Sequence, residues 1–312
     1  MSARKLISII GTGKLGSAVA LQLASRELAD LRLVDIIKGL PQGEALDLGQ
    51  MAAEQGVDVD IVGSNDYKDI SGSDLVVVIG GLGRKPGMSR LDLQEKNEAI
   101  IRGISERIVE YAPKSLVLMV TNPVDVMTYL SWKVTGFDPS RVFGQSGMLD
   151  TMRFKYFISR AVGVSTSSIH AVVVGEHGDS MVPLPRFSTV NGVPITELLS
   201  PDQVAETVER TRKTAAEVIA LKGATIYAPA HGIAKMVESV IKDKRMVLCM
   251  TARLNGEYGA HDVYVDVPAV LGARGVDRVI ELKLNEEERS AFMKSVDVVK
   301  TAVGHLKTVK PP

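Results

Sequence analysis

The sequence predicts an α/β fold, in which a doubly wound parallel sheet is followed by a mixed α+β unit. Short β-branched runs alternate with longer amphipathic stretches from residue 5 to about 140. That order produces parallel strands joined by right-handed crossover helices. Two runs, residues 75–79 and 116–120, are apolar throughout, as expected of strands covered on both faces. After about residue 145 the alternation stops, and long helical patterns surround paired β-rich segments.

The periodicity places the individual elements along the chain. In the first part we expect strands at residues 6–10, 31–35, 60–63, 75–79 and 116–120, with helices at 17–29, from about 43, and at 90–111. In the second part we expect helices at residues 150–162, 201–220, 229–242 and 285–303, β segments at 171–174 and 186–190, and an antiparallel ribbon of 246–252 with 261–267. Asn285 is the expected N-cap of the last helix, whose first turn is acidic. The boundary between the two domains is placed at 143/144.

The overall composition excludes several classes of protein. The chain has 312 residues, a size that favours two domains, and its 37 basic and 37 acidic residues give no formal net charge. A neutral chain argues against a nucleic-acid partner. No apolar run reaches the roughly 18 residues needed to cross a bilayer, so no membrane partner is expected. The single cysteine, Cys249, rules out an intrachain disulfide and is expected to be a small core residue, and a cytoplasmic location follows as the expectation.

A glycine-rich turn follows the first strand and opens the first helix. In the stretch 11–16, Gly11 allows the tight turn, Gly13 lets backbone N–H groups approach a pyrophosphate, and Gly16 lets helix and strand pack closely. Asp35 closes the next strand, where it can accept hydrogen bonds from a ribose hydroxyl and would repel a 2′-phosphate. The alternative to nucleotide binding is a glycine turn beside an exposed aspartate. We interpret residues 1–143 as a dinucleotide-binding domain of the Rossmann type, with NAD as its cofactor.

His177 is the histidine best placed for chemistry. It lies between two glycines at the end of an apolar strand, which places it at a turn, and its pKa near neutrality suits proton transfer. Asp150 and Arg153 are three residues apart on a predicted helix and therefore share a face. Two interpretations fit this spacing. Either the two residues form a local ion pair, or they belong to an active site in which Asp150 orients His177 while Arg153 binds a carboxylate. The other histidines are expected to be structural or solvent-facing: His170, His231, His261 and His305.

Two further arginines lie in the short glycine-rich loop that leads into the helix at residues 90–111. Arg84 and Arg90 bring a local positive charge to an otherwise neutral chain, so we expect an anion to lie over this loop. Together with Arg153 and His177 they indicate a site for a small dianion with a reactive carbon–oxygen bond. No metal site is expected.

As a set, these motifs resemble the lactate/malate dehydrogenase family from Ile7 to about Leu284. The matching stretches are residues 11–16, 43–48, 84–90, 121–125, 149–153 and 175–179. The resemblance implies NAD-dependent reduction of a 2-keto acid and makes residues 144–312 the substrate domain. It also implies a homo-oligomer, a dimer or a tetramer, with contacts through the helix that begins near Gly43 and the helix after Ala230.

The resemblance also implies the role of each site residue. His177 is the proton donor and acceptor, Asp150 orients it, and Arg153 binds the C1 carboxylate of the substrate. Arg90 polarises the carbonyl as its loop closes, and Asn122 contacts the substrate or the nicotinamide. The residues assigned to the cofactor are Gly11, Gly13, Lys14, Leu15, Gly16, Asp35, Asn97, Val120 and Asn122.

Arg84 favours the malate branch of this family. Lactate enzymes commonly carry an uncharged residue at the matching place, whereas malate enzymes carry the arginine of Arg-Lys-Pro-Gly-Met, which stands here at residues 84–88. The second carboxylate of oxaloacetate would be costly to bury without such a partner. We therefore expect hydride transfer between NADH and oxaloacetate to give (S)-malate. Thr225 matches a substrate-pocket position that differs between the branches, and its hydroxyl fits either substrate.

Three other functions fit part of the sequence. A lactate or other 2-hydroxy-acid dehydrogenase would share the fold and would differ in its preference for pyruvate. A non-catalytic NAD-binding protein would lack His177, Asp150 or one of the arginines, all of which are present. A short-chain or sugar-nucleotide oxidoreductase would share the glycine turn but would carry a Tyr-x-x-x-Lys pair, and neither Tyr111 nor Tyr227 has a lysine four residues on.

Overall fold

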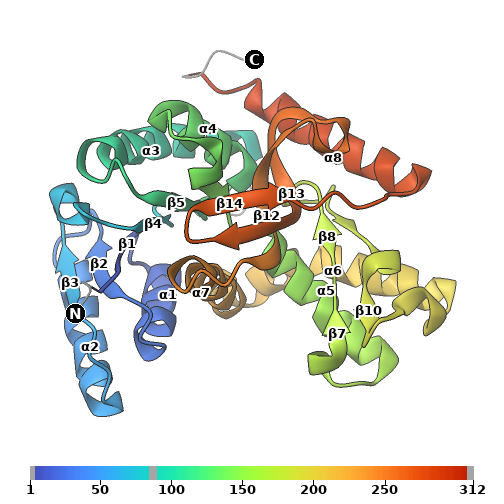
Figure 1. Ribbon diagram of the computed structural model, residues 1–312, viewed down its shortest axis with the longest axis horizontal. Coiled ribbons are helices and arrows are strands. Elements are labelled where there is room, and N and C mark those ends of the chain that lie inside the picture. The colour runs from blue at the N-terminus through green and yellow to red at the C-terminus, as the bar shows by residue number, and fades with distance from the viewer. Residues whose placement is uncertain (1–3, 84–89, 308–312) are drawn as a thin grey trace.

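One sheet of nine strands runs through the protein (Figure 1), and the computed structural model describes residues 4–83 and 90–307. The parallel strands are β1 (Leu6–Ile10), β2 (Asp30–Val34), β3 (Ile61–Ser64), β4 (Leu75–Val78), β5 (Leu116–Met119) and β6 (Val142–Gly144). The antiparallel strands are β12 (Met246–Asn255), β13 (His261–Gly272) and β14 (Gly275–Val279). Across the sheet the order is β14-β13-β12-β6-β5-β4-β1-β2-β3.

The parallel part confirms the predicted doubly wound sheet. Its order reverses between β1 and β4, the place where sheets of this kind bind ligands beyond the carboxyl ends of their strands. Every residue of β4 and β5 is buried, because helices cover both faces of the sheet. The predicted antiparallel ribbon of β12 and β13 also exists, and it continues the same sheet because Thr251 pairs with Gly144 at the end of β6.

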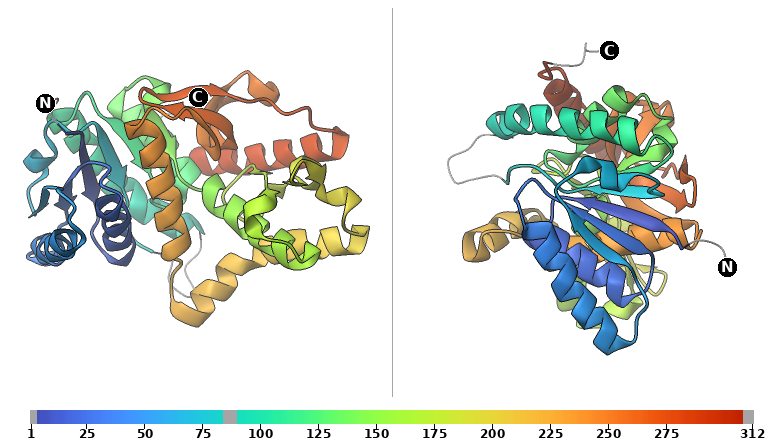
Figure 2. Two further views of the ribbon diagram at one scale, coloured as in Figure 1. Left: turned by 60° about the horizontal axis from the view of Figure 1, so that its bottom comes forward. Right: turned by 90° about the vertical axis from the view of Figure 1, so that its left-hand side faces the viewer.

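Two layers of helices enclose the parallel strands (Figure 2). One face carries α1 (Lys14–Ser25), α2 (Leu40–Gln55) and α7 (Tyr227–Ile241), and the other carries α3 (Arg90–Tyr111) and α4 (Val124–Thr135). The predicted bounds of α3 are confirmed. The helix expected at residues 17–29 was placed too late, because α1 begins right after Gly13 and ends before Glu27, whose φ of 50° no helix tolerates. The sequence analysis assigned no helix to residues 124–135.

The remaining helices and two small sheets form the lobe on the right of Figure 1 and the layer above it. The helices are α5 (Gly147–Val162), α6 (Pro201–Lys222) and α8 (Glu286–Val303). The short strands are β7 (Ile169–His170), β8 (Val173–Val174), β9 (Val182–Pro183), β10 (Thr189–Val190) and β11 (Val193–Pro194). The β segment expected at 186–190 is therefore wrong for its first half. Residues Pro185–Phe187 form a 3-10 turn instead, because proline favours the first position of a helical turn.

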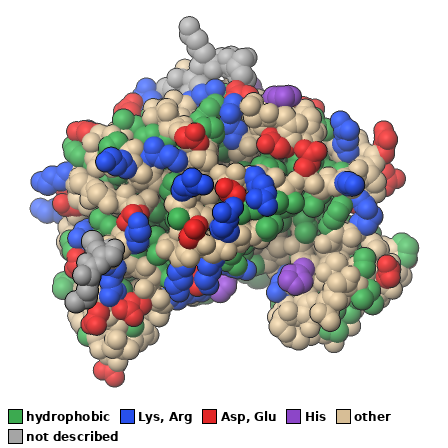
Figure 3. All heavy atoms as spheres, viewed as in Figure 1, with side chains coloured by type: hydrophobic (Ala, Val, Ile, Leu, Met, Phe, Trp, Pro, Cys, Tyr) green, Lys and Arg blue, Asp and Glu red, His purple; other side chains and the backbone are tan. Residues whose placement is uncertain are grey.

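The last helix forms as its sequence predicts. The side chain of Asn285 accepts the backbone N–H of Glu288 (2.8 Å), and the side chain of Glu288 accepts the backbone N–H of Asn285 (2.9 Å). This reciprocal pair is a capping box, which satisfies two backbone donors at the helix start. Basic and acidic side chains are interspersed over the face shown in Figure 3. In the described part of the chain, no helix combines the length and apolar character needed to cross a membrane.

Two helical glycines offer a direct test of the packing between α1 and the sheet. A Cβ at Gly16 would lie 2.0 Å from the carbonyl oxygen of Gly11, whereas one at Gly49 in α2 would meet no heavy atom within 4 Å. We expect Gly16→Ala to lower the free energy of unfolding by about 1–3 kcal/mol, because overpacking displaces the helix. The control Gly49→Ala should raise it by about 0.5–1 kcal/mol. Chemical denaturation measures both, and effects of the same sign would contradict the packing described.

Candidate active site

Three loops meet where the sheet order reverses. Gly11, after β1, adopts a φ of +98°, and a Cβ there would fall 2.5 Å from the backbone nitrogen of Gly80, after β4. Thr121, after β5, donates its hydroxyl to the carbonyl of Gly80 (2.8 Å). The close approach at Gly11 explains why this turn requires glycine. The carboxyl ends of β1, β4 and β5 therefore form one rigid edge.

The start of α1 fits a pyrophosphate. Gly13 is the N-cap of the helix, and no side chain caps it, so the first N–H groups point to an external acceptor. A cavity of about 710 Å³ opens at this end, and its lining includes Thr12, Lys14 and Lys222. Two cationic side chains and a set of helix-terminal donors match a doubly charged phosphate group.

Asp35 lies at the end of β2, beside this cavity. One of its carboxylate oxygens accepts the backbone N–H of Thr12 (2.7 Å), and the other accepts that of Ile37 (2.9 Å). These bonds fix the carboxylate. The oxygen that faces Thr12 also accepts the hydroxyl of that residue (3.4 Å), so the oxygen that faces Ile37 is the one that keeps a lone pair for a ribose hydroxyl. Nearby, Leu15 is partly buried in α1 and Val120 is buried at the end of β5. The residues present therefore fit a dinucleotide, and the individual cofactor contacts stay predictions.

Asn97, which is predicted to contact the cofactor, connects two loops at this edge of the sheet. Its side chain, fully buried in α3, accepts the backbone N–H of Leu82 (2.8 Å) and donates to the carbonyls of Leu82 (3.1 Å) and Asn122 (2.7 Å). It thus ties the loop after β4 to the loop after β5. Asn122 itself is exposed at this edge. The geometry makes Asn97 a support for the loop that carries Asn122.

The loop between β8 and β9 presents His177. Its first residue, Gly175, exchanges two backbone hydrogen bonds with Asp266 of β13, each 2.9 Å long. The backbone N–H of His177 then donates to a carboxylate oxygen of Asp125 (2.9 Å), which belongs to the first turn of α4. The histidine is therefore fixed from two directions before its side chain makes any contact.

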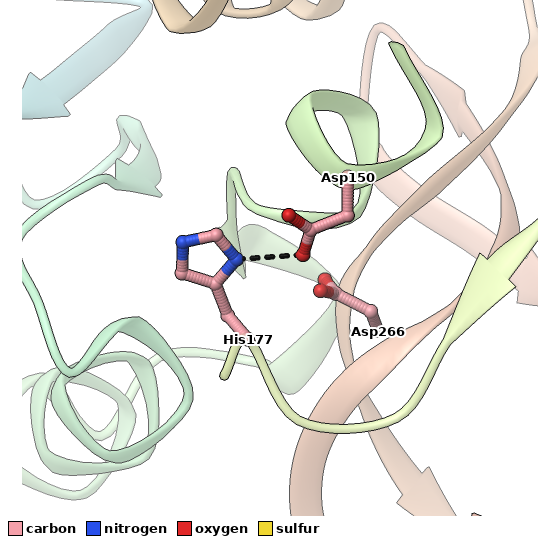
Figure 4. Close-up of side chains that lie close together, drawn as sticks. All are labelled: Asp150, His177 and Asp266. Carbon is pink, nitrogen blue, oxygen red and sulfur yellow. Dashed lines mark hydrogen bonds and ion pairs between the residues drawn. The ribbon is translucent and has the colours of Figure 1, made fainter. Parts of the chain in front are cut away.

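The side chains of Asp150, Arg153 and His177 meet (Figure 4 shows the first and the last of them). Nδ1 of His177 lies 2.7 Å from one carboxylate oxygen of Asp150, and the guanidinium of Arg153 donates to the other oxygen, also at 2.7 Å. Asp150 is only 1% exposed. The local ion pair of the first interpretation therefore forms, and the same carboxylate contacts His177 as the second one requires, while the binding of a substrate carboxylate by Arg153 stays a prediction. Within the described part of the chain no group is hydrogen-bonded to Nε2 of the imidazole, the nitrogen that could exchange a proton with a substrate.

The environment of His177 favours its charged form. Burial alone would lower its pKa, but the charge and the hydrogen bond of Asp150 outweigh that effect and raise the pKa from 6.5 to about 9. His177 therefore carries a proton at neutral pH, as a proton donor to a carbonyl oxygen must. The other four histidines are exposed. Cys249 is buried in β12, where burial raises its pKa to about 11, so the thiol remains neutral.

For three predicted site residues the described part of the structure gives no contact with Asp150, Arg153 or His177. Arg84 lies outside the described residues. Of Arg90 only the backbone is described, as the first residue of α3. Thr225 is partly buried two residues before α7.

The sequence analysis missed two acidic residues around His177. Asp125 is the last residue of the matching stretch 121–125 but was given no role of its own, and Asp266 stands between Val265 and Val267 in a buried strand. A carboxyl group in the middle of an apolar strand is a recognisable signal, because burying it requires partners.

The sequence analysis also overlooked a Tyr-x-x-x-Lys pair. Tyr129 and Lys133 have this spacing on α4. Both side chains bind Asp262 (3.2 and 3.4 Å), and Tyr129 is completely buried among Trp132 and Tyr264. This pair is part of the packing of α4 against β13, so the short-chain oxidoreductase alternative gains no support from it.

The fold and the site together define a dinucleotide-binding oxidoreductase with a histidine–aspartate pair for proton transfer. Comparisons with known proteins agree. Residues 5–144 match the lactate/malate dehydrogenase NAD binding domain, and residues 147–309 match the lactate/malate dehydrogenase alpha/beta C-terminal domain. The chain belongs to the lactate/malate dehydrogenase family. The resemblance, the predicted oxidoreductase class and the predicted cofactor, NAD, are thereby confirmed.

Individual relatives come from both branches of the family. A malate dehydrogenase of Roseiflexus sp. strain RS-1 is 47% identical over 308 residues, which cover 98% of this chain and 100% of the relative. The solved malate dehydrogenase of Aeropyrum pernix has a TM-score of 0.93 at 45% identity and covers 95% of this chain and 97% of its own. A Cryptosporidium parvum lactate dehydrogenase, solved with lactic acid and nicotinamide adenine dinucleotide, has a TM-score of 0.95 at 36% identity and covers 99% and 100%.

The control of Asp150 over His177 can be measured without any turnover. We expect Asp150→Asn to lower the pKa of His177 by about 2 units or more, because the raising charge is lost and the lowering effect of burial remains. Nuclear magnetic resonance of histidine-labelled protein follows the titration, with His177→Asn for assignment. The exposed His231 serves as the internal control. A His177 pKa that stays near 9 in Asp150→Asn would show that the pair does not set it.

Proposed function

We propose that the chain is an NAD-dependent malate dehydrogenase that interconverts oxaloacetate and (S)-malate. The observation that carries this proposal is the buried Asp150 carboxylate, which holds His177 and Arg153 in 2.7 Å contacts. A protonated imidazole beside a guanidinium suits a substrate with a keto oxygen next to a carboxylate. The relatives of highest identity given above, which are named malate dehydrogenases, support the choice of the malate branch.

The proposed mechanism assigns each step to one group of the chain. Arg153 binds the C1 carboxylate of oxaloacetate, and Arg84 binds the second carboxylate. Arg90 stabilises the charge that develops on the keto oxygen, and His177 gives its proton to that oxygen. When bound, NADH supplies the hydride to the keto carbon. Oxidation of malate reverses these steps, and Asp150 then stabilises the imidazolium that forms.

The remaining parts of the proposal concern the chain as a whole. Residues 1–143 bind the cofactor, residues 144–312 bind the substrate, and the protein works in the cytoplasm as a dimer or a tetramer. Apolar side chains on the helices that the family resemblance names support an oligomer, since Leu46 on α2 is 69% exposed and Tyr227 at the start of α7 is 75% exposed.

The first test compares substrates and cofactors. We expect NADH with oxaloacetate to be the best of four pairings, the others being NADH with pyruvate and NADPH with either acid. Steady-state kcat/KM for each pairing measures the preference. A higher kcat/KM for pyruvate would replace the proposal by the lactate alternative, and absent turnover with intact NAD binding would favour a non-catalytic protein.

The second test concerns Arg84. We expect Arg84→Gln to lower the ratio of kcat/KM for oxaloacetate to that for pyruvate by about 100-fold or more, equivalent to about 2.7 kcal/mol, because only oxaloacetate carries the second carboxylate. Arg102→Gln, at an exposed position of α3, is the matched control and should leave the ratio unchanged. An unchanged ratio in Arg84→Gln would remove this arginine from substrate selection.

The third test is the pH dependence of both directions. His177 has a raised pKa of about 9, so the protonated form that reduction needs is present below that pH and is lost above it. We therefore expect kcat/KM for oxaloacetate to fall about tenfold per unit above pH 9, while malate oxidation rises towards pH 9 and levels off. If reduction with chemistry rate-limiting is unchanged on both sides of pH 9, His177 is not the proton donor.

A further inference from the structure

Behind His177 lies a second set of buried polar groups that the mechanism above does not use. One oxygen of Asp266, one of Asp150 and a ring nitrogen of His177 all lie within 4.8 Å of one another (Figure 4). Asp266 is 2% exposed and belongs to β13, whose backbone also pairs with Gly175. A third carboxyl group so close to a catalytic pair changes its electrostatics in any protonation state.

Two hydroxyl groups connect Asp266 to Asp125. The hydroxyls of Ser146 and Thr251 lie 2.7 Å apart, and both contact the same oxygen of Asp266, at 2.8 and 2.9 Å. Thr251 also contacts an oxygen of Asp125 at 3.3 Å. The other oxygen of Asp125 accepts the backbone N–H of His177. The network therefore begins beside the imidazole and ends at the backbone of the same residue.

The number of protons in this network decides how it works. Each hydroxyl has one proton to donate, so two ionised carboxylates would leave two of the four oxygen–oxygen contacts without a proton. One additional proton, on either Asp266 or Asp125, turns three of the four contacts into hydrogen bonds. Ser146 and Thr251 are fully buried, so no solvent replaces the missing donor, and uncompensated oxygen pairs at these distances repel.

The surrounding charges favour the same proton count. The charged and titratable groups that face the network come from α4, α5, β12, β13 and the loop after β8: Asp125, Asp150, Arg153, Cys249, Asp266 and Glu176. Apart from Glu176, whose carboxylate is bound by the hydroxyl of Ser180, a single negative charge left on Asp125 and Asp266 together and that of Asp150 balance Arg153 and protonated His177. Burial and the charge of Asp150 raise the pKa of Asp266 to about 7, and burial and the charge of Asp266 raise the pKa of Asp125 well above its ordinary value.

We infer that Asp266 is a positioning residue for His177 and that Asp266 shares one proton with Asp125 through Thr251 and Ser146. The pair keeps one negative charge behind the imidazole, and it keeps the loop of His177 attached to β13 and α4. The inference rests on the proposed role of His177 only where catalysis is concerned, because the proton count is a property of the folded protein.

Infrared spectroscopy tests the shared proton directly. At about pH 8 ordinary carboxyl groups are ionised, so we expect wild-type protein to retain one protonated-carboxyl band. We expect the band to disappear in Asp266→Asn and equally in Asp125→Asn, since a single remaining carboxyl gives up the proton. Asp262→Asn, four residues earlier in the chain than Asp266 and outside the network, is the control that keeps the band. A wild-type spectrum without this band, or single variants that retain it, would overturn the inference.

The titration of His177 tests the electrostatic consequence. Each single variant still has one carboxylate behind the imidazole, so we expect its His177 pKa to move by less than about half a unit. In the double variant Asp125→Asn/Asp266→Asn no charge remains on this pair of side chains, although Asp150 keeps its contact with His177, and we expect the His177 pKa to fall by at least about one unit, a tenfold loss of proton affinity. Additive shifts in the singles and the double would instead mean two independent carboxylates.

Two provisions keep the outcome decisive. If the double variant does not fold, the infrared bands of the single variants decide, because a merely structural role of Asp266 would lower stability without removing a protonated carboxyl. Neither measurement requires turnover. An inactive protein with the predicted band would refute the proposed function and keep the shared proton, whereas an active malate dehydrogenase without the band would do the reverse.

Discussion

The site depends on one buried carboxylate that serves two cations. Asp150 is shielded from solvent, and a lone carboxylate there would carry a large desolvation cost. Arg153 and protonated His177 each meet one of its oxygens, so both cations offset that cost and both are oriented by the carboxylate. Under the proposed mechanism this arrangement couples binding to chemistry, since the group that orients the guanidinium proposed to bind the substrate also holds the proton on the imidazole. Removing the carboxylate would disturb both functions together.

The two halves of the chain supply this site jointly. Helix α5 begins three residues after β6 and delivers Asp150, whereas His177 comes from a loop bound to β13 through Gly175 and to α4 through Asp125. Since β12 and β13 continue the sheet that begins with the dinucleotide-binding strands, the proton donor and the carboxyl edge belong to one framework. Continuity of the sheet explains how Asp125 of the first half keeps its 2.9 Å contact with the backbone of His177 in the second half.

Local signals in the sequence predicted helices and strands, whereas contacts between residues far apart in the sequence were not predicted. The strand alternation gave the doubly wound sheet, and Asn285 marked the start of α8 correctly, because capping depends on neighbours three residues away. α4 was missed because nine of its residues are buried, so its sequence lacks a polar face at helical spacing. Asp266 meets Ser146 across 120 residues of sequence, and no periodicity encodes such a contact. The joining of Asp150 with His177 was expected only through resemblance to a family.

The chain is structurally similar to both branches of the family. The substrates of the two branches share the chemical groups that Arg153, Asp150 and His177 are proposed to recognise. Under the proposed mechanism Arg153 and the Asp150–His177 pair act on a carboxylate and an adjacent carbonyl, which pyruvate and oxaloacetate have in common. A framework that positions these three side chains is therefore equally suited to either acid, and TM-scores of 0.93 and 0.95 to a malate and a lactate enzyme are consistent with that. Selectivity has to reside in side chains that face the end where the substrates differ. A second carboxylate requires a cation there, and the residue that we propose for this role is Arg84.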